Sequence, residues 1–170
     1  DRSATHNAAT RLIASGCRNI LYLYTSNSYS GANKREGCLD ALKGCGLPVR
    51  EEYIRQCPKD VLAAKELLLK IHDDGLVFDG ILTSDDTLAV GAVKYAHAAG
   101  RSIPDDLSII GYNNSIYAVC TDPELTSIDS KIEALCTTTI NTLMGVFNGG
   151  NVPSRTTIAA DLIKRATTKF

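Results

Sequence analysis

Hydrophobic side chains along this chain recur with two different spacings. In four segments they return every three or four residues, which predicts helices with one apolar face. These segments are residues 5–15, 32–43, 59–72 and 86–99. Short apolar runs typical of buried strands lie between and after them. These runs are residues 20–24, 49–54, 78–83 and 107–111. Because strands and helices follow one another in turn, the pattern predicts a doubly wound α/β fold with a mainly parallel sheet.

The last third of the chain departs from this order. Residues 125–128 have the pattern of a short strand, and residues 131–147 carry the strongest helical pattern of the chain. Gly149 and Gly150 follow that helix, and glycine is common just past a helix end. Residues 156–163 are then expected to form a last strand.

Polar residues follow the first, third and fourth predicted strands. The first loop contains Ser28, the second contains Asp85 and Asp86, and the third contains Tyr112 and Asn113. In open α/β sheets, ligands bind beyond the carboxyl ends of the strands. Hydroxyl, amide and carboxylate groups form hydrogen bonds with sugars and similar metabolites. The sequence therefore predicts a site for a small polar ligand at this edge of the sheet.

An ordinary structural role is also open to each of these residues. Asp85 or Asp86 can cap the helix that follows, and Asn113 can form a turn with its neighbour. Tyr112 can be a core residue with an exposed hydroxyl group. Arg35 lies in the first turns of its predicted helix, where the helix dipole disfavours a cation. This position favours a ligand or a carboxylate as the partner of Arg35.

The composition fits one globular domain of ordinary size. Of the 170 residues, 44% are hydrophobic and 22% are charged, which is enough apolar material for a core. The formal net charge of -1 gives this segment no electrostatic attraction to nucleic acid or to an anionic membrane. No apolar run is long enough to cross a bilayer, and the first residues carry no signal-peptide pattern. We expect no membrane partner.

The six cysteines and three histidines lack the spacing of a metal site. There is no CxxC pair and the histidines lie far apart, so we expect neither a metal ion nor a cofactor. Cys38, Leu42 and Cys45 fall at positions that place both thiols on the apolar face of one helix. Free buried thiols favour a cytoplasmic location, although an even number of cysteines leaves disulfides open.

Motifs of the common α/β enzymes are absent. The chain has no GxGxxG after the first strand, no GxxxxGKS/T and no GxSxG, which argues against dinucleotide, P-loop and hydrolase sites. A phospho-acceptor receiver domain would need acidic residues after the first strand, and residues 25–27 are not acidic. We therefore expect no enzymatic activity. The alternative hypothesis is an enzyme that uses Asp85 or Asp86 as a general base.

Six motifs occur in one order across nearly the whole chain. They are LIASG at 12–16, REG at 35–37, SDDTLAVGA at 84–92, GRSIPDDLSIIGYNN at 100–114, DPELTSI at 122–128 and LIKRATT at 162–168. Together they resemble the lactose-repressor (LacI/GalR-type) family of bacterial transcription regulators. The resemblance implies a two-lobed effector domain of the periplasmic-binding-protein-like type I fold. A sugar or a related polar metabolite would bind between the lobes.

The resemblance also implies a domain organisation. Residues 1–122 and 151–170 would form most of the carboxyl-terminal lobe, and residues 123–150 would be a crossover strand and helix of the amino-terminal lobe. The rest of that lobe and a helix-turn-helix that binds operator DNA would lie outside this chain. In such regulators the effector changes how a dimer binds its operator.

Three ligand-contacting positions of the family can be carried over. Its arginine falls on Arg35, its Asn or Asp after the third strand falls on Asp85, and its Asp after the fourth strand falls on Asn113. The amide of Asn113 departs from the family pattern, because an amide accepts fewer hydrogen bonds than a carboxylate and can donate them instead. Cys17 stands where the family usually has histidine.

The main hypothesis is therefore an effector-sensing module of a cytoplasmic repressor. A homodimer is expected, with residues 87–99 and 115–122 as its surfaces. The alternative is a solute-binding protein of a transport system, which shares the two-lobed fold. The apolar stripe of residues 131–147 predicts that this helix packs on another chain or folds back, because an exposed stripe of this kind favours association.

Overall fold

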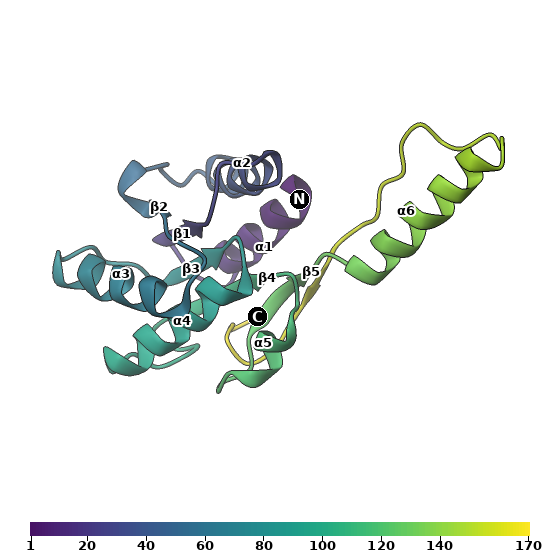
Figure 1. Cartoon of the computed structure of the whole chain (residues 1–170). Helices are drawn as coiled ribbons and strands as arrows, with labels where there is room; N and C mark the ends of the chain where they lie inside the picture. Colours follow the sequence, from purple (N-terminus) through teal and green to yellow (C-terminus); the bar gives the residue numbers. More distant parts are fainter.

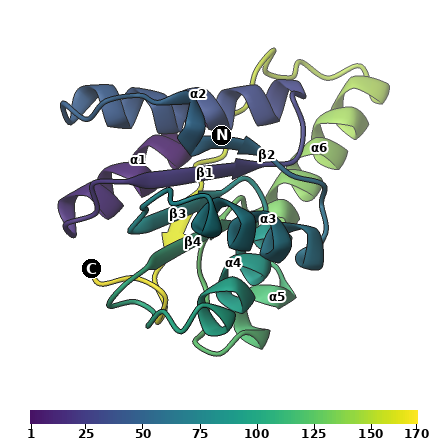
Figure 2. The same ribbon diagram turned by 90° about the vertical axis from the view of Figure 1, so that its left-hand side faces the viewer.

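The chain forms a six-stranded sheet with helices on both faces (Figure 1, Figure 2). The computed structural model describes residues 1–170. The strands are β1 (Ile20–Tyr24), β2 (Ile54–Gln56), β3 (Gly80–Thr83), β4 (Ser108–Tyr112), β5 (Thr126–Asp129) and β6 (Asp161–Ile163). The helices are α1 (Arg2–Ala14), α2 (Tyr29–Gly44), α3 (Val61–Asp73), α4 (Asp86–Ala98), α5 (Ile116–Cys120) and α6 (Ile132–Phe147). A single 3-10 turn, η1 (Glu51–Tyr53), precedes β2.

The strand order is β2-β1-β3-β4-β5-β6. All neighbouring strands are parallel except β6, which is antiparallel to β5. The chain runs from β1 outward to β2 and then back past β1 to β3. This reversal is the switch point at which doubly wound sheets open a crevice beyond their strands. The predicted fold class is confirmed.

Alternate residues of β1 face two separate cores. Leu21 and Leu23 pack with side chains of α3 and α4, whereas Ile20 and Tyr22 pack with those of α1 and α2. Helices cover both faces of the central strands, which explains why those strands are apolar at nearly every position. The helices α3 and α4 approach closely at Gly91, where a Cβ atom would lie 2.5 Å from Cβ of Ala64.

Two of the predicted strands are shorter than expected. The segment 49–54 contributes only its last residue to β2, because the turn η1 occupies the residues before it. The segment 156–163 forms a strand only from Asp161 onward. The residues before Asp161 lie beside α6, where no strand is available to pair with them (Figure 1). The short helix α5 was not predicted.

The strand β5 belongs to this sheet. It pairs with β4 in parallel, with Ile110 opposite Thr126 and Tyr112 opposite Ile128. The resemblance had assigned this strand, together with the helix after it, to the other lobe. The chain instead leaves the sheet after Asp129, at Lys131, whose backbone has a positive φ of 53°.

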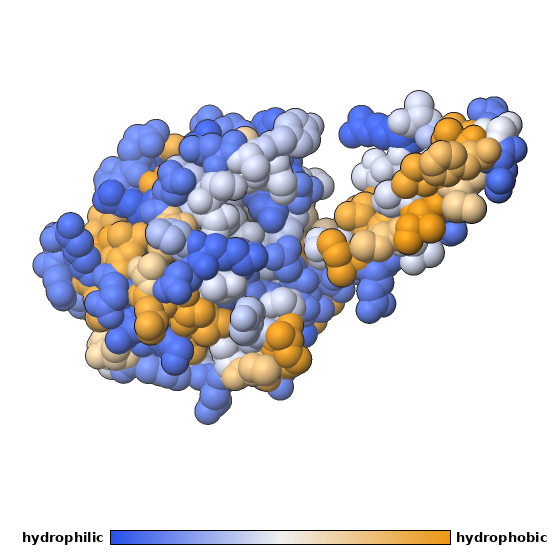
Figure 3. Space-filling view, viewed as in Figure 1, coloured by the Kyte–Doolittle hydropathy of each residue, from blue (hydrophilic) through white to orange (hydrophobic).

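Helix α6 projects away from the sheet and its helices (Figure 1). None of its residues is buried. Its large apolar side chains are exposed to solvent, and Figure 3 shows them as an orange surface on the projecting arm. They are Ile132, Leu135, Ile140, Leu143, Met144, Val146 and Phe147. The helix does not fold back onto the sheet, so that part of the prediction is wrong.

All six cysteines are free thiols. Cys38 is buried in the core beneath α2, as predicted, but Cys45 is exposed. The prediction for Cys45 is wrong because α2 ends at Gly44, and Cys45 caps the helix outside its apolar face. None of the helices has the length and apolar character that a membrane span needs.

Candidate functional site

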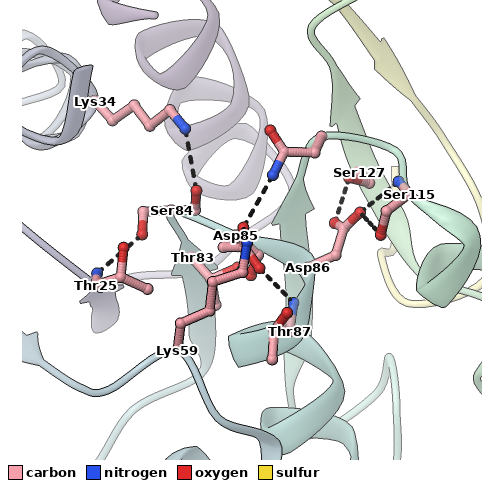
Figure 4. Close-up of polar contacts among 11 residues, drawn as sticks. Thr25, Lys34, Lys59, Thr83, Ser84, Asp85, Asp86, Thr87, Ser115 and Ser127 are labelled. Atoms are coloured by element: carbon pink, nitrogen blue, oxygen red, sulfur yellow. Dashed lines mark hydrogen bonds and ion pairs between the residues drawn. The ribbon is translucent and has the colours of Figure 1, made fainter. Parts of the chain in front are cut away.

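The loops that follow β1, β3 and β4 meet at one edge of the sheet. The parallel register aligns the ends of these strands, with Leu23 opposite Thr83 and Leu82 opposite Ile110. The loops also contact one another, because the backbone N–H of Thr25 donates a hydrogen bond to Oγ of Ser84 over 3.2 Å. Asp85 and Asp86, which the sequence singled out, therefore lie where these loops meet (Figure 4).

Asp85 is the residue through which these loops are connected. Its Oδ1 atom accepts a hydrogen bond from the N–H of Thr87 over 2.9 Å, which makes it the N-cap of α4. Its Oδ2 atom accepts from the side-chain amide of Asn113 over 3.0 Å and lies 2.7 Å from Nζ of Lys59. We call the edge of the sheet where the loops after β1, β3 and β4 meet the ligand edge, because the sequence predicts a ligand there. Asp85 lies at this edge and also caps α4, so one carboxylate combines the two roles that were stated above as alternatives.

Asn113 adopts an unusual backbone conformation. Its φ is 102° and that of Asn114 is 49°, and a positive φ is uncommon for residues other than glycine. The conformation is held from outside the loop. Asn114 donates its N–H to Oγ of Ser127, and its side-chain oxygen accepts a hydrogen bond from Arg165. The amide of Asn113 is thereby placed against Asp85.

An open cavity of about 500 Å³ lies beside this pair. Its walls come from the start of α3, the start of α4 and the loop after β4. Its lining residues are Lys59, Asp60, Val61, Asp85, Thr87, Asn113, Ser115 and Tyr117. This volume is within the range of small-molecule sites. Most of the lining side chains are polar, so the cavity suits a ligand with several hydrogen-bonding groups.

Asp86 points away from the cavity and is 1% exposed. Its Oδ1 atom accepts from Oγ of Ser127 over 2.6 Å, and its Oδ2 atom accepts from both N and Oγ of Ser115. Burial raises the pKa of this carboxyl group above its ordinary value, although these hydrogen bonds lower it in part. Asp86 ties the loop after β4 and the strand β5 to the start of α4 (Figure 4), which is a structural role.

Lys34 reaches this edge from α2. Its Nζ atom donates to the carbonyl oxygen of Ser84 over 3.1 Å and lies 3.6 Å from the ring centre of Tyr112. Burial lowers the pKa of this ammonium group to about 8, and the charge of Lys59 acts in the same direction. The carboxylates of Asp85 and Asp86 offset only part of that effect.

The other predicted site residues lie around this centre. Tyr112 is 2% exposed, and its hydroxyl donates to Oδ1 of Asp1 over 2.8 Å. Burial raises the pKa of Tyr112 to about 12. Ser28 is the N-cap of α2 and accepts from the N–H of Gly31. Arg35 lies with its guanidinium carbon 5.9 Å from the ring centre of Tyr24, and its buried Nε atom has no hydrogen-bond partner.

Comparison with known proteins agrees with this arrangement. A family model described as "Periplasmic binding protein-like domain" matches residues 9–168. The chain belongs to this family. An HTH-type transcriptional regulator from Lachnoclostridium phytofermentans is 48% identical over 170 residues, which are 100% of this chain and 51% of the relative. The regulator AscG of Escherichia coli is 28% identical over 96% of this chain and 49% of its own length. The chain thus spans about half the length of these relatives.

Solved structures of this periplasmic-binding-protein-like family show the same fold. A sugar-binding transcriptional regulator of the LacI family from Escherichia coli, in complex with phosphate, has a TM-score of 0.90 and 26% identity. The match covers 98% of this chain and 60% of that one. The resemblance to lactose-repressor-type regulators is therefore confirmed, and these relatives are transcriptional regulators, not enzymes.

Within this family member, the structure brings together some of the predicted residues and not others. The side chains of Asp85 and Asn113 form a direct hydrogen bond, and Tyr112 precedes Asn113 in the chain, with its ring against the ammonium group of Lys34. Ser28 and Arg35 form no hydrogen bond with Asp85 or Asn113.

Sequence reasoning missed Lys34 and Lys59. Lys34 lies four residues before Cys38 and seven before Ala41, which are both buried on the inner face of α2. Residues at this spacing share a helix face, and this signal could have identified Lys34. Lys59 precedes α3 in a loop, and no sequence signal places its ammonium group beside Asp85.

Proposed function

We propose that this chain is the carboxyl-terminal lobe of an effector-binding domain in a bacterial transcription regulator. The observation that carries the proposal is the polar cavity at the ends of β3 and β4, with the Asp85–Asn113 pair in its wall, in a chain whose relatives are transcriptional regulators. The effector is a small polar metabolite of the sugar class. Its binding changes the affinity of the whole protein for operator DNA, which a helix-turn-helix outside this chain contacts.

The exposed helix α6 supports the proposed division into lobes. Residues 1–122 and 151–170 form the carboxyl-terminal lobe, and the segment 123–150 belongs with the amino-terminal lobe, apart from the strand β5. An apolar helix with no buried residue is costly to leave in water, because roughly 25 cal/mol is gained per Å² of apolar surface that is covered. A second lobe that packs on α6 would cover this apolar surface, and in the proposed arrangement it would also close the open side of the cavity.

A homodimer is the proposed assembly. Large apolar side chains of α5 are exposed at the far side of the sheet from α2, namely Ile116, Tyr117 and Val119, and they fall in the segment 115–122 predicted as a dimer surface. The substitution Val119→Lys would bring a charge into that surface without altering the cavity lining, and the expected outcome is dissociation to monomers in light scattering. The exposed control Lys43→Gln should leave the dimer intact. A Val119→Lys protein that remains dimeric would contradict this surface.

Calorimetry and DNA binding on the intact protein test the function. A panel of monosaccharides and their acidic and phosphorylated derivatives is titrated into the protein, and each binder is added to a complex with the promoter fragment of the protein's own gene. We expect at least one compound to bind and to change the DNA affinity at least tenfold. A protein whose DNA affinity responds to no member of the panel, while it binds one of them, contradicts the proposal.

A pair of variants connects that response to the cavity. Asp85→Ser removes the carboxylate that faces Lys59 and Asn113 but keeps a residue that caps α4 well. We expect it to weaken effector binding about 10- to 100-fold, because Lys59 and the amide of Asn113 lose the charged partner that holds them in the cavity wall, and a hydrogen bond to a charged group contributes about 1.5–3 kcal/mol. Asp105→Ala is the matched control, since Asp105 is exposed and lies outside the cavity.

The proposed location is cytoplasmic, in keeping with six free thiols.

A further inference from the structure

The ligand edge of the sheet contains an ammonium group without a carboxylate partner. Lys34 forms no ion pair within the chain, and its hydrogen bond goes to a neutral carbonyl oxygen, that of Ser84. The face of the Tyr112 ring lies against the other side of the ammonium group. A cation–π contact and one neutral acceptor compensate a partly buried charge less well than a carboxylate does. Lys34 therefore retains donor capacity beside Ser84, the residue before Asp85, although it does not itself line the cavity.

The nearby carboxylates cannot supply the missing partner. Asp85 is already paired with Lys59 at 2.7 Å and also accepts from Thr87 and Asn113. Asp86 is buried, and both of its oxygen atoms are occupied by serine donors. Each carboxylate at the end of β3 is thus committed to other groups.

A carboxylate at the start of α1 is committed in the same way. Asp1 accepts the hydroxyl of Tyr112 at one oxygen and the hydroxyl of Ser30 at the other. Acceptors do remain on the cavity side, in Asp60, whose Oδ1 atom caps α3, and in the side-chain oxygen of Asn113. The unmatched feature of this edge is therefore the positive charge of Lys34, which no carboxylate of the chain pairs with.

A second cation on α2 adds to this excess. Arg35 follows Lys34, and its only carboxylate neighbour is Glu36, the next residue, at 4.0 Å. Its Nε atom is buried and donates to nothing in the chain. A buried donor without a partner costs about 1–3 kcal/mol. Two adjacent cations of α2 therefore lack good acceptors, Lys34 beside Ser84 at the end of β3 and Arg35 over Tyr24 at the end of β1.

We infer that the effector carries an anionic group, a carboxylate or a phosphate, which binds to Lys34 at the end of β3. This inference rests on the proposed function and narrows it from polar metabolites in general to acidic ones. The anion provides the counter-charge that the chain lacks, while Asn113, Lys59 and the hydroxyl groups around the cavity bind the polar remainder of the molecule. Lys34 is then the residue that selects acidic over neutral effectors.

Matched neutral and anionic sugars test the inference on the intact protein. Glucose is compared with glucose 6-phosphate and glucuronate, galactose with galacturonate, and ribose with ribose 5-phosphate, with inorganic phosphate as a probe of the group alone. Isothermal titration should show that the tightest binder is an anion and that it binds at least tenfold more tightly than its neutral parent. The acidic and the phosphorylated members of the panel distinguish a carboxylate from a phosphate.

Variants of α2 show whether Lys34 is responsible. Lys34→Gln should weaken binding of the anion about 10- to 100-fold, the loss expected for a charge-assisted hydrogen bond, and should weaken binding of the neutral parent much less, so that the preference for the anion falls. Lys34→Arg should retain most of the affinity. Lys43→Gln is the matched control, because Lys43 is an exposed lysine in the last turn of the same helix. Circular dichroism confirms that each variant is folded.

Three results would overturn the inference. The first is that a neutral sugar binds as tightly as its anionic partners. The second is that no anion of the panel, inorganic phosphate included, binds at millimolar concentration. The third is that Lys34→Gln binds the anion as well as the unaltered protein does. The operator assay separates this failure from failure of the proposed function. If a neutral sugar alters DNA binding, the proposed function stands and the inference of an acidic effector fails. If an anion binds through Lys34 without altering DNA binding, the anion site stands and the proposed function fails.

Discussion

The buried carboxylate of Asp86 provides a quantitative test of how the ligand edge is held in place. Its two oxygen atoms accept three hydrogen bonds, from the backbone N–H and hydroxyl of Ser115 and from the hydroxyl of Ser127. The two hydroxyls can rotate toward other acceptors, but the N–H of Ser115 cannot. In Asp86→Ala that N–H loses its acceptor, which costs about 1–3 kcal/mol, and the loss of charge-assisted bonds to both serines brings the expected destabilisation to about 3 kcal/mol.

The isosteric change Asp86→Asn should cost much less. The amide oxygen can take the place of Oδ2 and keep both bonds from Ser115, while the amide nitrogen faces the hydroxyl of Ser127, which can rotate and accept. Burial raises the pKa of Asp86, so the charged form is disfavoured in the folded protein and the neutral amide avoids that penalty. We therefore expect a loss of less than about 1 kcal/mol for Asp86→Asn.

The pH dependence follows from the same shift. Because the folded pKa of Asp86 is raised above its unfolded value, the stability that its protonation contributes is fully present below the unfolded pKa. That contribution is lost as the pH rises through the folded pKa. The unaltered protein should therefore gain stability relative to Asp86→Asn as the pH is lowered from neutral toward 4.

Urea unfolding of the two variants, with the exposed Asp105→Asn as control, measures these differences. Equal destabilisation by Asp86→Asn and Asp86→Ala would refute the reasoning, because it would show that the negative charge, not the set of acceptors, holds the loop. A stability difference between the unaltered protein and Asp86→Asn that grows with rising pH would refute it as well.

Three further predictions concern packing, charge balance and proton binding. Gly91→Ala should destabilise the protein by about 1–3 kcal/mol in thermal unfolding, because its Cβ would lie 2.5 Å from Cβ of Ala64. At the control position Gly44 nothing lies within 4 Å, so Gly44→Ala should be neutral or should stabilise the protein by about 0.5–1 kcal/mol. Asn113→Asp should lower the free energy of unfolding at neutral pH, because it places a second carboxylate against Oδ2 of Asp85, which lies 3.0 Å from the present amide nitrogen. Combining Asp85→Asn with Asn113→Asp should restore part of the loss in a double-mutant cycle. Strictly additive effects would contradict a direct contact. Anion affinity should fall when the pH is raised from 7 to 9, because the pKa of Lys34 is about 8, and calorimetry on Lys34→Arg should show no such fall.

The Asp85–Asn113 contact gives a physical reason for the departure noted at Asn113. Two carboxylates at these positions would repel each other across a distance of about 3 Å, whereas one carboxylate and one amide form a hydrogen bond. The resemblance implies an acid after the fourth strand and Asn or Asp after the third. In this chain the contact joins the carboxylate of Asp85 to an amide, so the pair carries one negative charge, which lies 2.7 Å from Nζ of Lys59.

The order of helices and strands and the position of the polar loops can be read from the amino-acid sequence. The apolar spacing of α2, α3 and α4 and the continuous apolar runs of β1, β3 and β4 are local signals, because they depend on which faces of an element must leave water. Parallel strands necessarily bring their carboxyl ends to one edge. The convergence of residues after β1, β3 and β4 was therefore predictable without a structure.

Only the tertiary structure decided which of two adjacent polar residues faces the ligand edge. Asp85 lies in the cavity wall and Asp86 is buried beneath it, and Lys34 reaches Ser84 while Arg35 lies over Tyr24. Local helix geometry already points adjacent side chains about 100° apart. Which of the two directions meets the ligand edge depends on the angle and register of the helix on the sheet, and these are set by contacts between segments that are distant in the sequence.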